Sequence, residues 1–352
     1  MSDMANPTVS QARSFQENPR HYPRKLQVGV YNFFSKRIPY KPLPANPKKI
    51  LVQAQEKIGD AVLLFPTISG LRKLFPESVI HLLCSRINEP LFQSIKEVER
   101  TMAYRSGRQF WNALKETKYD LFYNPKDHPS ITAFKISKNV RADVKVCIAH
   151  RRIEQHYNHG LTLSKTYRIL EKNSMILRAY DLDFTIKSFF PNTELNSPKN
   201  ENQISINLSS GSELRKWSLE NWITLIALVL KKNKHFRINL FVNGKDLHLA
   251  KQIEKQFSWA IKLIHPLYSI LEAGPIIQNS NLLISPDTAM IHIADAVGTP
   301  MVGLFSRDDR NVRRYRPYWV KYKILQSSTL SIQDIEPNEV FNAFEELMNQ
   351  SQ

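Results

Sequence analysis

The stretch that decides the fold is residues 50–84, ILVQAQEKIGDAVLLFPTISGLRKLFPESVIHLLC. It begins with a mostly apolar run (50–55), turns at Gly59, continues with apolar residues at helical spacing (61–74) and ends in a second apolar run (79–84). A strand, a helix and a second strand in this order lie parallel in one sheet, joined by a right-handed crossover. The stretch therefore predicts an α/β protein built on a parallel sheet.

The same alternation continues along the chain and is interrupted once, by the polar residues 189–203, FFPNTELNSPKNENQ. This interruption is the expected linker between two α/β units of similar size. Before it, strands are predicted at 119–124 and 144–149, and helices at 89–96 and 130–138. After it, strands are predicted at 204–208, 236–242, 261–264, 282–285 and 301–305, and helices at 218–232, 247–257, 270–279, 288–297 and 334–348. The predicted organisation is an arm at 1–49, domains at 50–190 and 204–330, and a C-terminal helical segment at 331–352.

The chain carries a formal net charge of +17, and the excess lies in its first part. Residues 1–49 hold +7 and residues 50–200 hold +8, whereas residues 201–352 hold only +2. Such a surplus favours a polyanionic partner: nucleic acid, anionic membrane, or phosphorylated glycans and nucleotides. Zinc-finger spacing, an RNP aromatic strand and a basic heptad helix are all absent from the sequence, which argues against nucleic acid.

The first 49 residues are proline-rich and contain one compact apolar stretch, residues 26–34, with cations on both sides. Aromatic rings beside Lys and Arg suit the surface of an anionic membrane, so this stretch is a candidate interfacial anchor. A tail that packs on its own domain explains the pattern equally well. The residues concerned are Val28, Tyr31, Phe33 and Phe34, with Arg24, Lys25, Lys36 and Arg37 around them.

The remaining composition indicates a reducing compartment. Cys84 and Cys147 are the only cysteines, which excludes a disulfide scaffold and a CxxC zinc site. No apolar run reaches the roughly 20 residues that span a bilayer, and the first 49 residues lack the apolar block of a signal peptide. A cytoplasmic protein, at most peripheral to the membrane, is expected.

The first turn of interest, Glu56 to Asp60 (EKIGD), follows the first predicted strand. Gly59 is one of only 10 glycines, and a glycine at this point indicates a tight turn or a close backbone approach. Neither GxGxxG nor GxxxxGK[ST] occurs, so an ordinary dinucleotide or Walker-type site is not indicated. Taken alone, Asp60 is best explained as the N-cap of the following helix.

The second turn, residues 209–217 (SSGSELRKW), combines hydroxyl side chains, a glycine and two adjacent cations between a strand and a helix. Backbone N–H groups and a lysine charge in such a turn suit a diphosphate. For Lys216 the phosphate contact is the favoured interpretation, and for Arg215 a place in a solvated loop.

The third turn, residues 285–300 (SPDTAMIHIADAVGTP), is the densest. Asp287 and Thr288 begin a helix after a strand, and Gly298 ends it. His292 follows Asp287 by five residues and Thr288 by four, which places it on the ligand side of the first helical turns. A capping aspartate and a hydrogen-bonded histidine explain each residue singly, but the whole cluster favours a binding site.

Two further groups of cationic residues indicate no particular chemistry. The cluster of His150, His156 and His159 with Arg151 and Arg152 has no acidic residue that completes a metal-ligand spacing, so acceptor contact or a solvated loop is expected. The arginines between positions 307 and 316 are expected in a solvated loop.

Together, the three turns resemble glycosyltransferase family 9, the lipopolysaccharide heptosyltransferase family. The resemblance covers roughly residues 50–317 and is carried by three motifs in order. These are KIGDAV at 57–62 with Pro66 and Leu71-Arg72, KWSLENW at 216–222, and SPDTAMIHIA at 285–294 with Pro300 and Leu304-Phe305.

The resemblance implies a GT-B architecture, in which two Rossmann-like domains face a cleft and bind the acceptor on the first domain and the nucleotide sugar on the second. It implies an inverting, metal-independent transfer of a sugar, typically heptose from ADP-heptose, to a lipopolysaccharide or lipooligosaccharide core. No cofactor is implied. The expected partners are the nucleotide sugar, the lipid-linked acceptor and an anionic membrane surface at the cytoplasmic face, not nucleic acid.

The resemblance also assigns roles to residues. Asp60 is the expected general base. The donor is expected to contact Lys216, Gly244, Asp246, Asp287, Thr288, Ala289, Met290 and His292, and the acceptor Lys57, Gly59, Arg151 and Arg152. Ala289 stands where the family usually has Gly or Ser, and Ser218 where it usually has Pro, so the donor's identity stays open.

The chemistry agrees with these roles, because a carboxylate can take the proton of an acceptor hydroxyl while cations and a helix N-terminus stabilise a departing diphosphate. Three alternatives stay open: transfer of another nucleotide-linked sugar, charge-driven nucleic-acid binding, and a non-catalytic subunit that binds nucleotide sugars.

Overall fold

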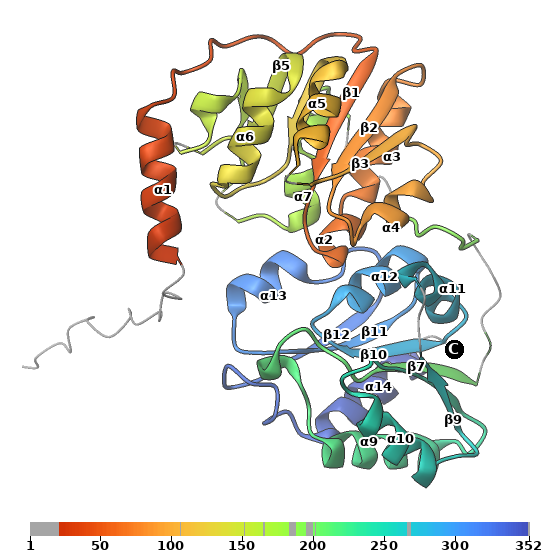
Figure 1. The fold of residues 1–352 in the computed structure, drawn as a ribbon. Coiled ribbons are helices and arrows are strands. Elements are labelled where there is room, and N and C mark those ends of the chain that lie inside the picture. Colours follow the sequence, from red (N-terminus) through yellow and green to blue (C-terminus); the bar gives the residue numbers. More distant parts are fainter. Residues whose placement is uncertain are drawn as a thin grey trace, which may run out of the picture.

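The computed structural model describes residues 21–105, 107–150, 152–164, 166–182, 188–194, 200, 202–265 and 269–350. The chain forms two halves, one above the other in Figure 1, and each is built on a six-stranded sheet in which all pairings are parallel. The α/β class predicted from residues 50–84 is confirmed.

The first half has the strand order β3-β2-β1-β4-β5-β6. Because the order reverses between β1 and β4, the loop after β1 lies at the switch point, where open parallel sheets bind ligands. The strands are β1 (Lys49–Ala54), β2 (Val79–Cys84), β3 (Arg100–Ala103), β4 (Lys118–Asn124), β5 (Arg141–Ile148) and β6 (His159–Leu161). The helices are α1 (His21–Phe33), α2 (Ile58–Val62), α3 (Phe65–Leu74), α4 (Glu89–Gln93), α5 (Arg108–Glu116), α6 (Ile131–Asn139), α7 (Ile169–Asn173) and α8 (Met175–Arg178), with a 3-10 turn η1 (Glu154–His156).

The second half has the strand order β12-β11-β10-β7-β8-β9, so its switch point lies between β7 and β10. The strands are β7 (Gln203–Asn207), β8 (Arg237–Phe241), β9 (Ile261–Ile264), β10 (Leu282–Pro286), β11 (Met301–Phe305) and β12 (Tyr322–Gln326). The helices are α9 (Leu219–Lys232), α10 (Leu247–Gln256), α11 (Ala273–Gln278), α12 (Ala289–Val297), α13 (Asp309–Tyr315) and α14 (Pro337–Asn349), with 3-10 turns η2 (Glu213–Arg215) and η3 (Ile270–Glu272). Helix α14 packs Val340, Phe344 and Leu347 into the core of this half.

The predicted strands β2, β9 and β11 agree with the structure residue for residue. The strands β3, β6 and β12, which were not predicted, all lie at sheet edges. An edge strand is covered less than a central one, so its sequence carries a weaker apolar pattern. The single helix predicted at 61–74 is divided into α2 and α3, because Pro66 has no N–H for a continuous helix and stands in the first turn of α3 instead.

The predicted arm contains a regular helix, α1. Its Val28 side chain is buried, and the Tyr31 ring stacks on Phe134 of α6 with 5.7 Å between centroids. One face of the apolar stretch therefore packs on its own half, as one of the two interpretations expected. None of the described helices is both long and apolar enough to cross a bilayer.

The two halves meet where α2 packs on α12, and Gly59 lies at this contact. A Cβ atom at Gly59 would lie 2.8 Å from Cδ2 of His292 and 3.5 Å from the Cα of Ala289. The close backbone approach predicted at this glycine is therefore an approach between the halves. The start of the predicted linker also packs inward, since Phe190 is buried and Phe189 stacks on Phe65.

A Gly59→Ala substitution should destabilise the protein. The new methyl group would collide with the buried His292 ring and force the halves apart, at a cost of about 1–3 kcal/mol. We expect a lower thermal midpoint, measured by calorimetry. Gly107→Ala is the matched control, because no atom lies within 4 Å of its added Cβ. Equal midpoints for the two variants would contradict this account of the interface.

Candidate active site

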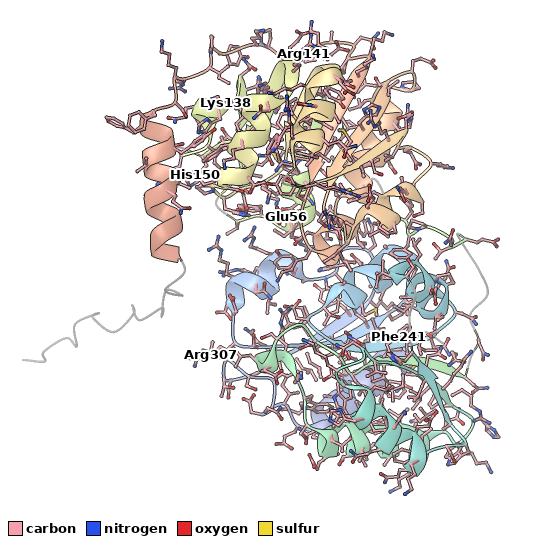
Figure 2. The ribbon with its side chains drawn as sticks, viewed as in Figure 1. Glu56, Lys138, Arg141, His150, Phe241 and Arg307 are labelled. Carbon is pink, nitrogen blue, oxygen red and sulfur yellow. The ribbon has the colours of Figure 1, made fainter. Side chains whose placement is uncertain are left out.

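A cavity of about 950 Å³ lies between the halves, and the three turns singled out in the sequence meet in it. The first turn follows β1, the second follows β7 and the third follows β10, so all three stand at the carboxyl ends of strands near a switch point. Figure 2 shows Glu56 at the edge of the first half that faces the second. The lining from the three turns is Glu56, Lys57, Ile58, Gly59, Asp60, Gly211, Ser212, Leu214, Arg215, Asp287, Thr288, Ala289 and His292.

Asp60 is not a helix cap. Helix α2 begins after Lys57, no side chain caps it, and Asp60 is its third residue. The N-cap explanation that the sequence favoured for Asp60 alone is therefore wrong. The half-buried carboxylate instead accepts a hydrogen bond of 3.2 Å from the hydroxyl of Tyr315, at the end of α13 in the other half.

Burial raises the pKa of the Asp60 carboxyl, and Glu56 raises it further. The positive charge of Lys172 opposes this effect and lowers the pKa, with smaller contributions from His292 and the Tyr315 hydroxyl. Lys172 is itself buried in α7, and a small cavity is lined by Asp60, Glu56, Lys126 and Lys172 together. The carboxylate is thus held partly out of water beside a buried cation, an arrangement typical of a functional acid or base.

Opposite Asp60, the third turn is held by Arg215. Its Nη1 donates to the backbone carbonyl of Asp287 (2.6 Å) and to Oδ2 of the same residue (3.1 Å). Asn311 of α13 donates to the same Oδ2 at 2.8 Å. Arg215 keeps about a quarter of its side chain exposed (28%) and lines the cavity, so its remaining donors are available to an anion.

Thr288 is the N-cap of α12, and its hydroxyl accepts from the N–H of Met290 at 3.3 Å. The amide of Asn207, at the end of β7, donates to the hydroxyls of Thr288 (3.2 Å) and Ser285 (3.0 Å). This network fixes the start of α12 at the cavity wall. A helix N-terminus carries partial positive charge and unpaired N–H groups, so it attracts an anionic ligand.

His292 lies on α12, buried between Gly59 and Tyr315. Burial lowers the pKa of this imidazole, although Asp287 and Asp60 raise it. The ring lines the cavity at the place where the second half meets the first.

A second cavity of about 430 Å³ shares Gly211, Thr288 and Ala289 with the first. Gly244, His265 and Met290 also line it, together with Phe241 at the end of β8, which Figure 2 labels. The two cavities therefore adjoin each other at the N-terminus of α12.

The structure separates the two adjacent cations of the second turn. The Nζ of Lys216 lies 2.9 Å from Glu213 and 3.2 Å from the buried Asp246, and neither Lys216 nor Asp246 lines either cavity. Arg215, expected in a solvated loop, is the cation of this turn that faces the cavity. The backbone direction at η2 decides which neighbour points inward, and composition does not contain that information.

The expected acceptor residues also differ in position. Lys57 and Gly59 line the large cavity, whereas Arg152 lies in an exposed loop where its carbonyl accepts from Asn32 of α1. Arg151 lies outside the described residues. His156 of the same cluster is buried against Phe134 and Asn32, and burial lowers its pKa to about 4. In the described part of the chain, no three His, Cys, Asp or Glu side chains group as a metal site requires.

Helix α13 supplies contacts that were not predicted. Besides Tyr315, its Arg314 bridges to Asp127 of the first half at 2.5 Å, and Tyr167 donates to the same carboxylate. Burial alone would raise the pKa of Asp127, but its hydrogen bond with His128, followed by the effects of Lys172, Tyr167 and Arg314, keeps that pKa well below its usual value. A sequence signal exists: Asp308 is an N-cap, and Asn311, Arg314 and Tyr315 follow at helical spacing.

Comparison with known proteins shows which proteins the chain resembles in sequence and in fold. "Lipopolysaccharide heptosyltransferase 3" of Escherichia coli is 21% identical over 277 residues, which are 71% of this chain and 81% of that protein. The solved structure of E. coli heptosyltransferase WaaC with ADP superposes with a TM-score of 0.72 at 14% identity, covering 85% of this chain and 99% of that one. Its structure with ADP-2-deoxy-2-fluoro heptose gives 0.69 at 16% identity, covering 85% and 99%.

These structural matches confirm the predicted GT-B architecture. The sequence profile of "Glycosyltransferase family 9 (heptosyltransferase)" matches residues 107–339, which is more than half of the chain. The chain therefore belongs to glycosyltransferase family 9, the heptosyltransferase family, and is a glycosyltransferase.

Proposed function

We propose that the protein transfers heptose from ADP-heptose, with inversion, to a lipopolysaccharide or lipooligosaccharide core, and that Asp60 is the general base. One observation carries this proposal: the half-buried carboxylate of Asp60 in the first half and the N-terminus of helix α12 in the second half line one cavity. The relatives named for lipopolysaccharide heptosyl transfer, and the neighbour solved with ADP, support the choice of donor and acceptor.

In the proposed reaction an acceptor hydroxyl attacks the anomeric carbon of the donor sugar. Asp60 takes the hydroxyl proton while the new carbon–oxygen bond forms, because a neutral hydroxyl is a poor nucleophile. The bond from the anomeric carbon to the diphosphate oxygen breaks, and its electron pair leaves with the nucleoside diphosphate. Attack and departure take place on opposite faces of the carbon, so the configuration inverts.

The leaving diphosphate gains negative charge in this step, and the second half stabilises it. The N–H group of Ala289 lies at the start of α12, where the N–H group of Met290 donates to the Thr288 hydroxyl. Arg215 supplies a full positive charge at the same wall. Such groups are already oriented before the charge develops, which is the largest contribution to catalysis in many enzymes.

The second cavity is the proposed site of the nucleoside. Gly244, Met290 and His265 line it, and it opens directly from the start of α12. Lys216 and Asp246, both expected to contact the donor, have a different proposed role: their ion pair holds the loop before α10 against the second turn.

The acceptor is proposed to enter from the side of the first half, where Lys57 and Gly59 line the cavity. A lipid-linked acceptor requires the enzyme to work at a membrane surface, so the proposed location is peripheral, at the cytoplasmic face. Arg152 is not part of this proposed acceptor contact, because it lines neither cavity.

Asp60→Asn should reduce transfer about 10²- to 10⁴-fold, because the amide cannot accept the hydroxyl proton. Affinity for ADP should change little, since the diphosphate contacts belong to the other half. ADP release in the presence of an acceptor core measures the rate of transfer, and calorimetric titration measures the affinity for ADP. Asp143→Asn, a surface change beside Lys118, is the control. Full turnover by Asp60→Asn would remove Asp60 from the mechanism. ADP binding without transfer in the wild-type protein would favour a non-catalytic subunit.

The pH dependence of kcat/KM should change when Lys172 is replaced. Asp60 acts as a base only when ionised, so kcat/KM should fall as the pH drops through the raised pKa of this carboxyl. Lys172→Met removes the cation that lowers this pKa, so the acid limb should move to higher pH while activity recovers at high pH. Lys172→Arg should restore the limb toward its original position, and Lys262→Met, on the other half, should leave it in place. An equal loss at every pH would indicate a merely structural lysine.

Arg215 and Lys216 can be separated by matched substitutions. Arg215→Met should raise the KM for the donor about 10- to 100-fold, the effect of losing a hydrogen-bonded charge worth about 1.5–3 kcal/mol. Lys216→Met should leave this KM nearly unchanged and lower the thermal midpoint, since it leaves Asp246 buried without its cation. Steady-state kinetics with varied donor decide the matter, and the reverse pattern would restore Lys216 as the phosphate contact.

A further inference from the structure

Helix α1 has two faces of different character, and one of them is bound to the first half. Val28 is buried (5% exposed), and Tyr31 stacks on Phe134. Asn32 is held by three hydrogen bonds: it donates to the carbonyl of Arg152 (3.0 Å), its own carbonyl accepts from Gln155 (2.8 Å), and its side-chain oxygen lies 2.8 Å from Nε2 of His156. The C-terminal part of α1 is therefore fixed in orientation.

The opposite face is apolar and exposed. Val30 is 52% exposed, Phe33 84% and Phe34 80%. The spacing of these residues, i, i+3 and i+4, places them together on the side of the helix that points away from α6. The rings of Phe33 and Phe34 pack edge to face, with 5.2 Å between centroids. A clustered aromatic surface of this kind, outside the catalytic cavity, marks an interaction site.

Cations border this face. Lys36 and Arg37 follow α1 directly and are exposed, and the nearest acidic partner, Glu154, lies 4.0 Å from Arg37. In Figure 1, α1 and α13 lie along the same flank of the molecule, and Figure 2 labels Arg307 on that flank. Arg307 is exposed, and the segment 308–316 exposes Arg310, Arg313 and Arg316 together with Asp308 and Asp309. An anionic surface along this flank would therefore meet positive charge from both halves.

We propose that the outward face of α1, formed by Val30, Phe33 and Phe34 with Lys36 and Arg37, docks on an anionic lipid bilayer. Phenylalanine rings enter the boundary between headgroups and acyl chains, while the cations stay at the level of the anionic headgroups. A second copy of the chain fits less well, because a two-fold interface would bring the same cations face to face. The inference rests on the proposed function, which requires a lipid-linked acceptor. A bilayer on this flank would lie beside the junction of the two halves, where such an acceptor has to enter.

Vesicle co-sedimentation of the full-length protein tests this inference without a donor or an acceptor. The wild type should bind vesicles of phosphatidylcholine mixed with phosphatidylglycerol, and bind pure phosphatidylcholine vesicles much more weakly. The double variant Phe33→Ser/Phe34→Ser should lose about ten-fold or more in partition coefficient. Lys36→Glu/Arg37→Glu should lose binding to the anionic vesicles and its dependence on salt. Leu330→Ser, at a 61% exposed apolar residue of the other half, is the control.

Unchanged vesicle binding by the phenylalanine variant would overturn the inference. A wild-type dimer in sedimentation velocity that becomes monomeric in this variant would also overturn it, and would assign the face to a second copy. The test is separable from that of the proposed function. Asp60→Asn should bind vesicles like the wild type, and Phe33→Ser/Phe34→Ser should retain transfer to a deacylated, water-soluble core acceptor.

Discussion

The close approach of α2 and α12 at Gly59 is the constraint on which the site depends. With 2.8 Å between His292 and the position of a Cβ atom, no residue larger than glycine fits without movement. The contact brings the N-terminal ends of two short helices to one cavity, one carrying Asp60 and the other beginning at Thr288. The distance between these two helix ends is set by the packing between the halves, because the two helices are not neighbours in the sequence. The geometry of the candidate site and the packing between the halves therefore depend on the same contact.

Burying a carboxylate at this contact has an electrostatic cost, which the surrounding charges reduce. Lys172 approaches Asp60 from within the first half, and Tyr315 approaches it from the second. The adjacent pair of Arg314 and Asp127 also joins the halves. Helix α13 thus contacts the first half through two consecutive side chains, Arg314 and Tyr315. Because Tyr315 occupies one oxygen of Asp60, an acceptor hydroxyl would reach the other oxygen or displace the tyrosine.

Much of the fold and of the candidate site was predictable from the sequence. Where a strand is followed by a turn and a helix, the turn lies at the carboxyl end of the strand, and a parallel sheet places all such turns at one edge. The interior strands and the third turn follow from local patterns of this kind. Orientation was not predictable: Arg215 and Lys216 are neighbours of equal charge, and only the path of η2 decides which of them lines the cavity. Lys172 was not predicted either, since its proximity to Asp60 arises from the packing of α7 against the end of α2 and against Tyr123 of β4, and not from sequence spacing.

The distribution of charge along the chain can be compared with the positions of the proposed diphosphate site and of α1. The second half carries +2 over residues 201–352, yet it holds the proposed diphosphate site, because a helix N-terminus and one arginine are sufficient for that anion. The excess of the first 200 residues is therefore not required by the donor. An exposed aromatic pair at the end of α1, bordered by cations, gives that excess a partner with extended negative charge. The proposed donor site would act through oriented dipoles at short range, whereas the proposed attraction to a lipid surface would depend on summed charge and weaken with salt.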